Sequence, residues 1–284
     1  MKGLLSVLVG LISLTVSTYG FTLVNTFSPN RGQLNAIGFN PADGLVHIHP
    51  SFDAQIYAYQ PDGTFVSSIT HPGTSTNDSD LNFVAGFTTI LDTLVPPGTM
   101  LVVNGESDPQ TLFAVDPADG NVLLTLALAE PIGQLTGGGF DPLSGELVTI
   151  DWQNDVIITF DTANGQQIRT FGFGAGWDAF FSDVEVGPNG NLYLVSDAQN
   201  VIRVLDPEGS SFQDFDVGPL GISGMSGIAI DPINNDAYIS STNGSVYHIE
   251  GLEVVPEPRT WALIIIGITM IGLTFRRRIF KRVH

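Results

Sequence analysis

The chain has 284 residues, no cysteine and a formal net charge of −19, with 29 acidic residues against 10 Lys plus Arg. This excess of negative charge repels nucleic acid and anionic membrane surfaces, so no nucleic-acid partner is expected. The absence of cysteine excludes a disulfide-stapled scaffold, and a hydrophobic core must therefore hold the fold.

The N-terminal twenty residues have the pattern of a secretory signal peptide. Met1 and Lys2 form a short basic start, an apolar run extends from Leu4 to Val16, and small residues follow as far as Gly20. This order is typical of a removable export signal. We therefore expect residues 1–20 to be cleaved after the chain has passed through the secretion translocon.

The body, residues 21–254, is built on two recurring turn motifs. Asp or Asn beside Pro, closed by Gly or Asn, is turn chemistry, because Pro sets φ and Gly accepts positive φ. Prolines of the first motif are spaced 56, 45, 46 and 44 residues apart: Pro41, Pro97, Pro142, Pro188 and Pro232. The second motif keeps nearly the same spacing, in the segments 59–63, 115–120, 160–165 and 205–209. Short β-branched and aromatic runs between the turns indicate strands.

Each repeat therefore contains four short strands in about 45 residues, as a β-propeller blade does. The fifth repeat lacks a fourth strand, and the segment Phe21–Phe27 matches the missing one. We predict an all-β fold with a single propeller of five four-stranded blades, closed by the N-terminal strand. Closure would remove the exposed sheet edges that otherwise promote aggregation. The extra residues of the longest interval are expected in a loop near His71 to Asp80.

These turn motifs at a blade period resemble the NHL or YVTN repeats of exported bacterial proteins. The resemblance covers nearly the whole body and implies a propeller, but it implies no particular activity.

The blade pattern places two kinds of connection on opposite faces. The short Asp-Pro-Gly turns lie on one face, and longer, varied connections lie on the other, where binding residues usually occur. Aromatic and acidic residues gather in these longer connections, namely Asp151, Trp152, Trp177 and Asp178. Aromatic rings can stack on sugars while carboxylates accept their hydroxyl groups, so we predict a ligand face here. The alternative is that both tryptophans simply pack between blades.

Two acidic residues occupy corresponding positions five residues before the first-strand prolines. Asp92 and Asp183 would both face the channel mouth, where carboxylates suit Ca²⁺. In lactonase-like propellers a divalent ion at that mouth polarises the substrate carbonyl. The alternative is a polar rim that holds water. His47 and His49 share a strand face and are a second candidate metal pair, but no third ligand is indicated.

The C-terminal segment 255–284 has three features in a fixed order. The motif Val255, Pro256, Glu257 and Pro258 is followed by an apolar helix over about 260–275 and then by Arg276, Arg277 and Arg278. This order resembles the PEP-CTERM sorting signal of exported bacterial proteins. The resemblance implies a temporary membrane anchor with a basic cytoplasmic tail, residues 276–284, and processing by an exosortase near the motif. The alternative is an ordinary C-terminal membrane anchor.

Together these features predict a sorted surface or extracellular-matrix protein that acts as a non-enzymatic binding or scaffold propeller, linked to exopolysaccharide or biofilm. Its precursor would be anchored in the inner membrane with a periplasmic body, and no cofactor is expected. One alternative is a lactonase-like or lyase-like enzyme that uses a divalent metal such as Ca²⁺. Another is a structural surface protein without a small ligand.

Overall fold

The computed structural model describes residues 21–73, 77–106, 109–129 and 133–252. The predicted signal peptide, 1–20, and the whole predicted sorting signal, 255–284, lie outside these residues. Among the described residues, no helix has the length and apolar character needed to cross a membrane.

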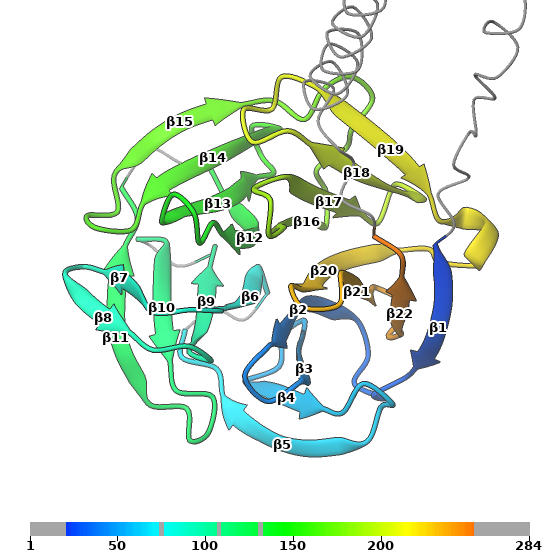
Figure 1. Ribbon diagram of the computed structural model, residues 1–284, viewed down its shortest axis with the longest axis horizontal. Coiled ribbons are helices and arrows are strands. Elements are labelled where there is room, and N and C mark those ends of the chain that lie inside the picture. Colours follow the sequence, from blue (N-terminus) through cyan, green and yellow to red (C-terminus); the bar gives the residue numbers. More distant parts are fainter. Residues whose placement is uncertain (1–20, 74–76, 107–108, 130–132, 253–284) are drawn as a thin grey trace, which may run out of the picture. The chain divides into compact units, whose positions relative to one another are not determined.

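Within the described residues, the strands form five four-stranded antiparallel sheets around a common centre (Figure 1). The first blade contains β2 (Leu34–Asn40), β3 (Leu45–Pro50), β4 (Gln55–Tyr59) and β5 (Phe65–Thr70). The second contains β6 (Ser79–Phe83), β9 (Met100–Asn104), β10 (Thr111–Val115) and β11 (Val122–Ala127). The third contains β12 (Leu135–Phe140), β13 (Glu146–Asp151), β14 (Val156–Asp161) and β15 (Gln167–Phe171).

The fourth blade contains β16 (Ser182–Val186), β17 (Leu192–Ser196), β18 (Val201–Leu205) and β19 (Phe212–Asp216). A single 3₁₀ turn, η1 (Gly218–Leu220), leads to the fifth blade. This last blade contains β20 (Met225–Asp231), β21 (Asp236–Ser241), β22 (Val246–Glu250) and β1 (Thr22–Phe27). In the first four blades the strand that comes first in the chain is the innermost (Figure 1). In the fifth blade β20 is the innermost strand and β1 is the outermost.

The N-terminal strand closes the ring as predicted. β1 pairs antiparallel with β22, from Thr22 opposite Glu250 to Phe27 opposite Val246. Phe27 also packs against Tyr59 of the first blade, with ring centroids 5.8 Å apart. The two ends of the propeller are therefore joined by a sheet and by side-chain packing, and the prediction of five blades is confirmed.

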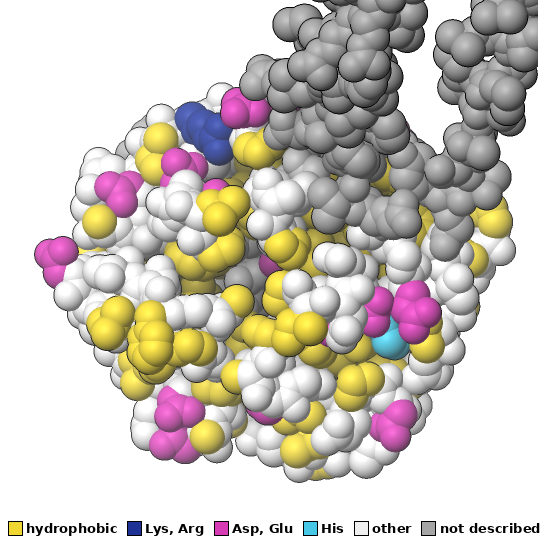
Figure 2. All heavy atoms as spheres, viewed as in Figure 1, with side chains coloured by type: hydrophobic (Ala, Val, Ile, Leu, Met, Phe, Trp, Pro, Cys, Tyr) yellow, Lys and Arg dark blue, Asp and Glu magenta, His cyan; other side chains and the backbone are white. Residues whose placement is uncertain are grey.

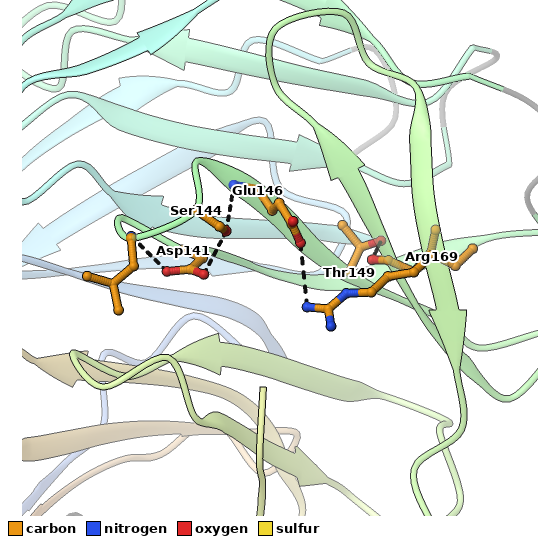
Figure 3. A network of polar contacts seen from close by, with 7 residues as sticks. Asp141, Ser144, Glu146, Thr149 and Arg169 are labelled. Atoms are coloured by element: carbon orange, nitrogen blue, oxygen red, sulfur yellow. Dashed lines mark hydrogen bonds and ion pairs between the residues drawn. The ribbon is translucent and has the colours of Figure 1, made fainter. Parts of the chain in front are cut away.

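The repeated turns owe their shape to the residues that define the motif, as the third blade illustrates (Figure 3). The Asp141 carboxylate accepts hydrogen bonds from the Leu143 backbone N–H at 2.8 Å and from the Ser144 hydroxyl at 2.7 Å. Gly145 then adopts φ +76°, a conformation that costs little only for glycine. Arg169 of the outermost strand β15 reaches Glu146, the first residue of β13, at 3.5 Å and ties that strand to the turn (Figure 3).

One sequence prediction about the second blade is wrong. The residues near His71 to Asp80 do not hold the whole excess, because β6 begins at Ser79 and is the innermost strand. The extra residues form a hairpin, β7 (Thr88–Ile90) and β8 (Thr93–Val95), inserted between β6 and β9. β6 contains several polar residues and therefore resembled a loop in the sequence. Polar residues are tolerated in this strand because it is one of the five innermost strands around the axis. Pro97 therefore ends the hairpin and does not follow an innermost strand.

The hydrophobic core consists of clusters between neighbouring blades rather than one central mass. One cluster joins the first and fifth blades, and others join the second to the third and the third to the fourth. Near the axis the innermost strands approach closely, which requires glycine. A Cβ on Gly38 would lie 2.9 Å from the Leu81 carbonyl oxygen, and one on Gly139 would lie 2.7 Å from the Val186 nitrogen. Glycine therefore allows the innermost strands of neighbouring blades to approach closely at these two points.

The inserted hairpin carries exposed apolar residues. Leu94 is 64% exposed, and Phe87, which precedes β7, is 71% exposed. Figure 2 shows hydrophobic side chains gathered over β7 and β8, with acidic side chains spread around the rest of this face. Basic side chains are scarce on it, as expected for a body with only Arg31, Arg169 and Arg203.

Candidate functional site

A cavity of about 250 Å³ opens among the longer connections of the second, third and fourth blades. We name it the interblade pocket. Its walls come from the segments that lead into the innermost strands β6, β12 and β16 and from the connections after β9 and β13. The lining residues are Asn77, Asp78, Glu106, Gln134, Thr136, Trp152, Phe180 and Phe181.

Two carboxyl groups form the polar side of the pocket. Asp78 is only 7% exposed, and burial together with the charge of Glu106 raises its pKa to about 6, although a hydrogen bond from the Trp152 side chain opposes the rise. The Asn77 amide nitrogen donates to Asp78 Oδ1 at 3.3 Å and to Glu106 Oε1 at 3.2 Å. The two carboxyls are therefore linked through a single amide group.

Side-chain amides also hold Glu106 from the third blade. Gln134 donates from Nε2 to Glu106 Oε1 at 3.0 Å, and Gln153 donates to Gln134 Oε1 at 3.1 Å. Neutral amide donors thus orient both carboxyl groups. The polar side of the pocket is arranged in advance for a ligand that donates hydrogen bonds.

Aromatic rings also line the pocket. Trp152 and Phe180 meet edge to face with centroids 5.7 Å apart, and Phe180 and Phe181 meet in the same way at 4.6 Å. Phe180 is 49% exposed. Asp178 helps to shape this loop, because its carboxylate accepts the Phe180 backbone N–H at 3.0 Å. The pocket thus combines an aromatic wall with an acidic rim.

Of the four residues predicted for the ligand face, only Trp152 lines this pocket. Asp151 is buried, and its carboxylate accepts the Gly133 N–H and the Asn154 amide, each at 2.7 Å. Trp177 packs against Phe173, and the guanidinium of Arg203 lies 5.0 Å from its ring centroid. Trp177 thus follows the packing alternative, and Trp152 packs against the same core cluster as well as lining the pocket. Asp178 and Asp151 shape the neighbouring loops.

The structure does not bring together the two acids predicted at the channel mouth. Asp183 lies on β16 beside the axis and is 1% exposed, whereas Asp92 is exposed in the turn between β7 and β8. The placement of Asp92 was wrong because Pro97 was aligned with the other first-strand prolines. The residue at the matching position is Asp80 on β6.

The axial carboxyl cluster, which we define as Asp80, Asp183 and Glu185, is held inside the ring. Asp183 accepts backbone N–H groups from Gly138 at 3.3 Å, Val184 at 2.7 Å and Ile228 at 2.7 Å, spanning three blades. Burial raises the pKa of Asp80 and of Glu185 well above the ordinary range, and Asp80 shares a hydrogen bond with Asp183. Among the described residues, no three or more His, Asp or Glu are grouped so that they could hold a metal ion.

The candidate metal pair, His47 and His49, is buried, and both side chains pack inside the protein. The His47 ring lies 4.8 Å from that of Phe83, and burial lowers the pKa of His47 to about 4. His49 contacts the Asp53 carbonyl through Nε2 at 2.9 Å. Both histidines thus lie in the buried interior of the first blade.

Most acidic and amide residues of the pocket were not predicted. Asp78, Gln134 and Phe181 each immediately precede an innermost strand, β6, β12 and β16. These three residues therefore occupy equivalent positions in three successive repeats. The sequence analysis missed this equivalence because it placed the start of the second blade after the hairpin instead of before it.

Comparison with known proteins supports the propeller fold. No family model matches the sequence, and a search of curated proteins finds no match. The crystal structure of glutaminyl cyclase from Myxococcus xanthus is similar, with a TM-score of 0.57, 10% identity, and coverage of 81% of this chain and 95% of that chain. The WD40 β-propeller domain of Doa1 has a TM-score of 0.46 and 14% identity, covering 76% of this chain and 78% of that one. At such identity the cyclase likeness shows the fold alone, and the chain has a β-propeller body.

Proposed function

We propose that this protein is an exported β-propeller that binds a saccharide of the cell surface or extracellular matrix in the interblade pocket. The observation that carries the proposal is the pairing of an aromatic wall, Trp152 and Phe180, with amide-held carboxyls, Asp78 and Glu106. Sugar rings offer apolar C–H faces to aromatic groups and hydroxyl donors to carboxylates. A concave site with a few fixed polar groups is the usual form of a small-ligand pocket.

A binding measurement on the purified full-length chain in detergent tests this proposal. A glycan array should show selective binding that is lost in Trp152→Ala. Phe52→Ala is the matched control, because Phe52 is 78% exposed on a long connection of the first blade and does not line the pocket. Binding that survives Trp152→Ala, or that is lost equally in the control, would argue against the pocket.

The export part of the proposal rests on the two ends of the sequence. We infer translocation by the secretion translocon, temporary anchoring in the inner membrane and exosortase processing near Pro256-Glu257-Pro258. Mass spectrometry of the cell-associated and secreted protein tests this route. A secreted form ending near the motif is expected, and an intact C-terminus in both fractions would contradict it.

A second candidate, an enzyme acting at the same pocket, is favoured by one observation. The Asp78 carboxyl has a pKa near 6 and lies beside Glu106, as suits a group that gives a proton to a leaving group near neutral pH. A lactonase-like or lyase-like reaction is therefore the alternative to simple binding. Incubation of the bound saccharide or a lactone panel with the chain, followed by product analysis, separates the two. Turnover that disappears in Asp78→Asn would establish the enzyme.

A further inference from the structure

One end of the propeller carries a group of exposed apolar side chains. It is the end at which each innermost strand connects to the strand beside it. Leu143 and Ile233 lie in two of these turns, and each is 72% exposed. Phe87 and Leu94 belong to the corresponding connection of the second blade, between β6 and β9, and are 71% and 64% exposed. We name the surface formed by these four residues the axial face.

A cavity of about 50 Å³ at the axis lies among these residues, and its lining comes from all five blades. Pro142 and Pro232 line it, each directly before one of the exposed turn residues, and so does Ala85, which precedes the hairpin. The other lining residues are apolar apart from Asn82 and Glu185. The four exposed residues therefore surround a hollow that is itself mostly apolar, and apolar side chains gathered in this way mark an interaction surface.

The hairpin is held in place, so the exposure of its apolar residues does not come from a loose loop. The Leu91 backbone N–H donates to the Thr162 carbonyl of the third blade at 3.1 Å. Ile90 and Val95 are buried and belong to the core cluster between the second and third blades. The hairpin thus packs with one set of side chains and presents another set to its surroundings.

The last strand of the body ends at the same end of the propeller. Ala237 in β21 pairs with Ile249 in β22, which places the end of β22 beside the turn that holds Ile233. Thr22, the first residue of β1, pairs with Glu250 at that end. The chain therefore leaves the body from the side on which the axial face lies.

The sequence limits how far the predicted membrane segment, about 260–275, can lie from this side. Only residues 253–259 separate that segment from Leu252, the last described residue. A linker of this length spans at most about 30 Å even when it is fully extended. An anchored chain therefore keeps the end of β22 close to the bilayer.

We infer that the axial face contacts a zwitterionic lipid surface while the chain is anchored, with Phe87, Leu94, Leu143 and Ile233 at the membrane interface. This inference rests on the proposed anchoring and deepens the proposed function. The interblade pocket is built from connections at the opposite end of the blades, so it would open away from the membrane, toward saccharides outside the cell.

The choice of lipid follows from charge. Large apolar side chains enter the region between lipid headgroups and acyl chains favourably. The turns at the axial face also hold carboxylates, among them Asp141 and Asp231, and these oppose contact with an anionic lipid surface. A zwitterionic surface gains the apolar contact without that repulsion.

The experiment uses the absence of cysteine, because a single one can be introduced and labelled. Leu94→Cys in the full-length chain is labelled with an environment-sensitive fluorophore and reconstituted into phosphatidylcholine vesicles that contain a nitroxide lipid. We expect blue-shifted emission and a loss of fluorescence by lipid quenching. Phe52→Cys is the matched control, because Phe52 is 78% exposed in the connection between β3 and β4, at the opposite end of its blade. Its label should be neither shifted nor quenched.

A second pair of variants tests whether apolar contact holds the axial face on the lipid. Phe87→Ser should reduce the quenching of the label in Leu94→Cys, whereas Phe52→Ser should leave it unchanged. Both phenylalanines are exposed, so neither change removes a core residue. Undiminished quenching in Phe87→Ser would overturn the role of these side chains in lipid contact.

Flotation of the vesicles distinguishes the inference from the anchoring on which it rests. A chain that does not float with the vesicles overturns both. A chain that floats, but whose two labels are quenched equally or not at all, overturns the lipid contact and leaves the anchoring intact. A blue shift without lipid quenching shows that a protein surface, such as a second copy, covers the hairpin, and it also overturns the lipid contact. Quenching confined to the label of Leu94→Cys supports both.

Discussion

Asp78 and Asp80 are two residues apart, yet they belong to two carboxyl groups with different surroundings. Asp80 is enclosed with Asp183 and Glu185 inside the ring, where backbone N–H groups hold Asp183. Asp78 lies with Glu106 at the edge of a cavity and is held by side-chain amides. Burial raises pKa values in both places.

The difference shows that a raised carboxyl pKa does not by itself mark a binding site. Within the axial carboxyl cluster, Asp183 and Glu185 accept hydrogen bonds from other blades, and Glu185 also lines a second cavity, at the axis. Asp78 and Glu106 border the interblade pocket. We therefore propose that Asp183 serves stability and that the interblade pocket serves binding.

The largest expected effect on stability comes from a substitution in the axial carboxyl cluster. Asp183→Ala leaves the buried N–H groups of Val184 and Ile228 without their acceptor, as well as that of Gly138. We expect a loss of about 3–5 kcal/mol in the free energy of unfolding. Denaturant unfolding measures it, with Glu208→Ala, at an exposed turn residue, as the control. Equal small losses in both variants would contradict the fastening role.

A substitution of Asp78 in the interblade pocket should instead raise the stability of the protein. The folded-state pKa of Asp78 is raised from 3.8 to about 6, so the folded protein holds this proton more tightly and stability falls as the pH rises from about 4 to about 6. Asp78→Asn removes this penalty. The variant should be more stable by roughly 3 kcal/mol above pH 6 and unchanged below pH 4.

Melting temperatures recorded from pH 3.5 to pH 8 check this prediction. An Asp78→Asn variant less stable than the parent at pH 8 would show that the carboxylate serves the fold. In that case the contrast between the two carboxyl groups would be lost.

A smaller effect is expected from Trp152→Phe, which keeps an aromatic ring but removes the indole N–H. That hydrogen bond favours the ionised form of Asp78. The pKa of Asp78 should therefore rise further above its ordinary value in the variant. Carbon-13 NMR titration of the Asp78 carboxyl measures the change, and an unaltered or lower pKa would contradict the contact between the two side chains.

The smallest effect, none, is expected when the C-terminal segment is removed. Both carboxyl groups and the ring closure lie before Val254, since β1 pairs with β22, which ends at Glu250. A chain ending at Val254 should therefore fold, stay soluble and keep its melting temperature. Unfolding or aggregation of that chain would make the tail part of the domain.

The general plan of the fold could be predicted because its signals are local. Turn residues recur at a fixed period, and the orphan strand near Phe27 matches the fourth strands of other repeats. The hairpin β7–β8 broke the period, and the polar strand β6 lacked the usual apolar pattern. For that reason Asp92 was predicted at the position that Asp80 occupies in the structure.

The pocket was predicted only in part because its residues come from three blades. Trp152 was recognisable as an aromatic residue in a long connection. The roles of Asp78, Glu106 and Gln134 depend on their meeting across blade boundaries, and hydrogen bonds between distant residues leave no local pattern. Trp177, like Trp152, lies in a long connection, but its ring packs beside Arg203 and does not line the pocket.

The most direct test of the account is the titration of the Asp78 carboxyl with and without a saturating concentration of a saccharide that the glycan array identifies. Hydroxyl groups that donate hydrogen bonds to the carboxylate favour its ionised form, so the pKa of about 6 in the free protein should fall on binding. A pKa that is unchanged or raised by the bound saccharide would show that the ligand does not meet Asp78, and would contradict the proposal that this pocket is the binding site.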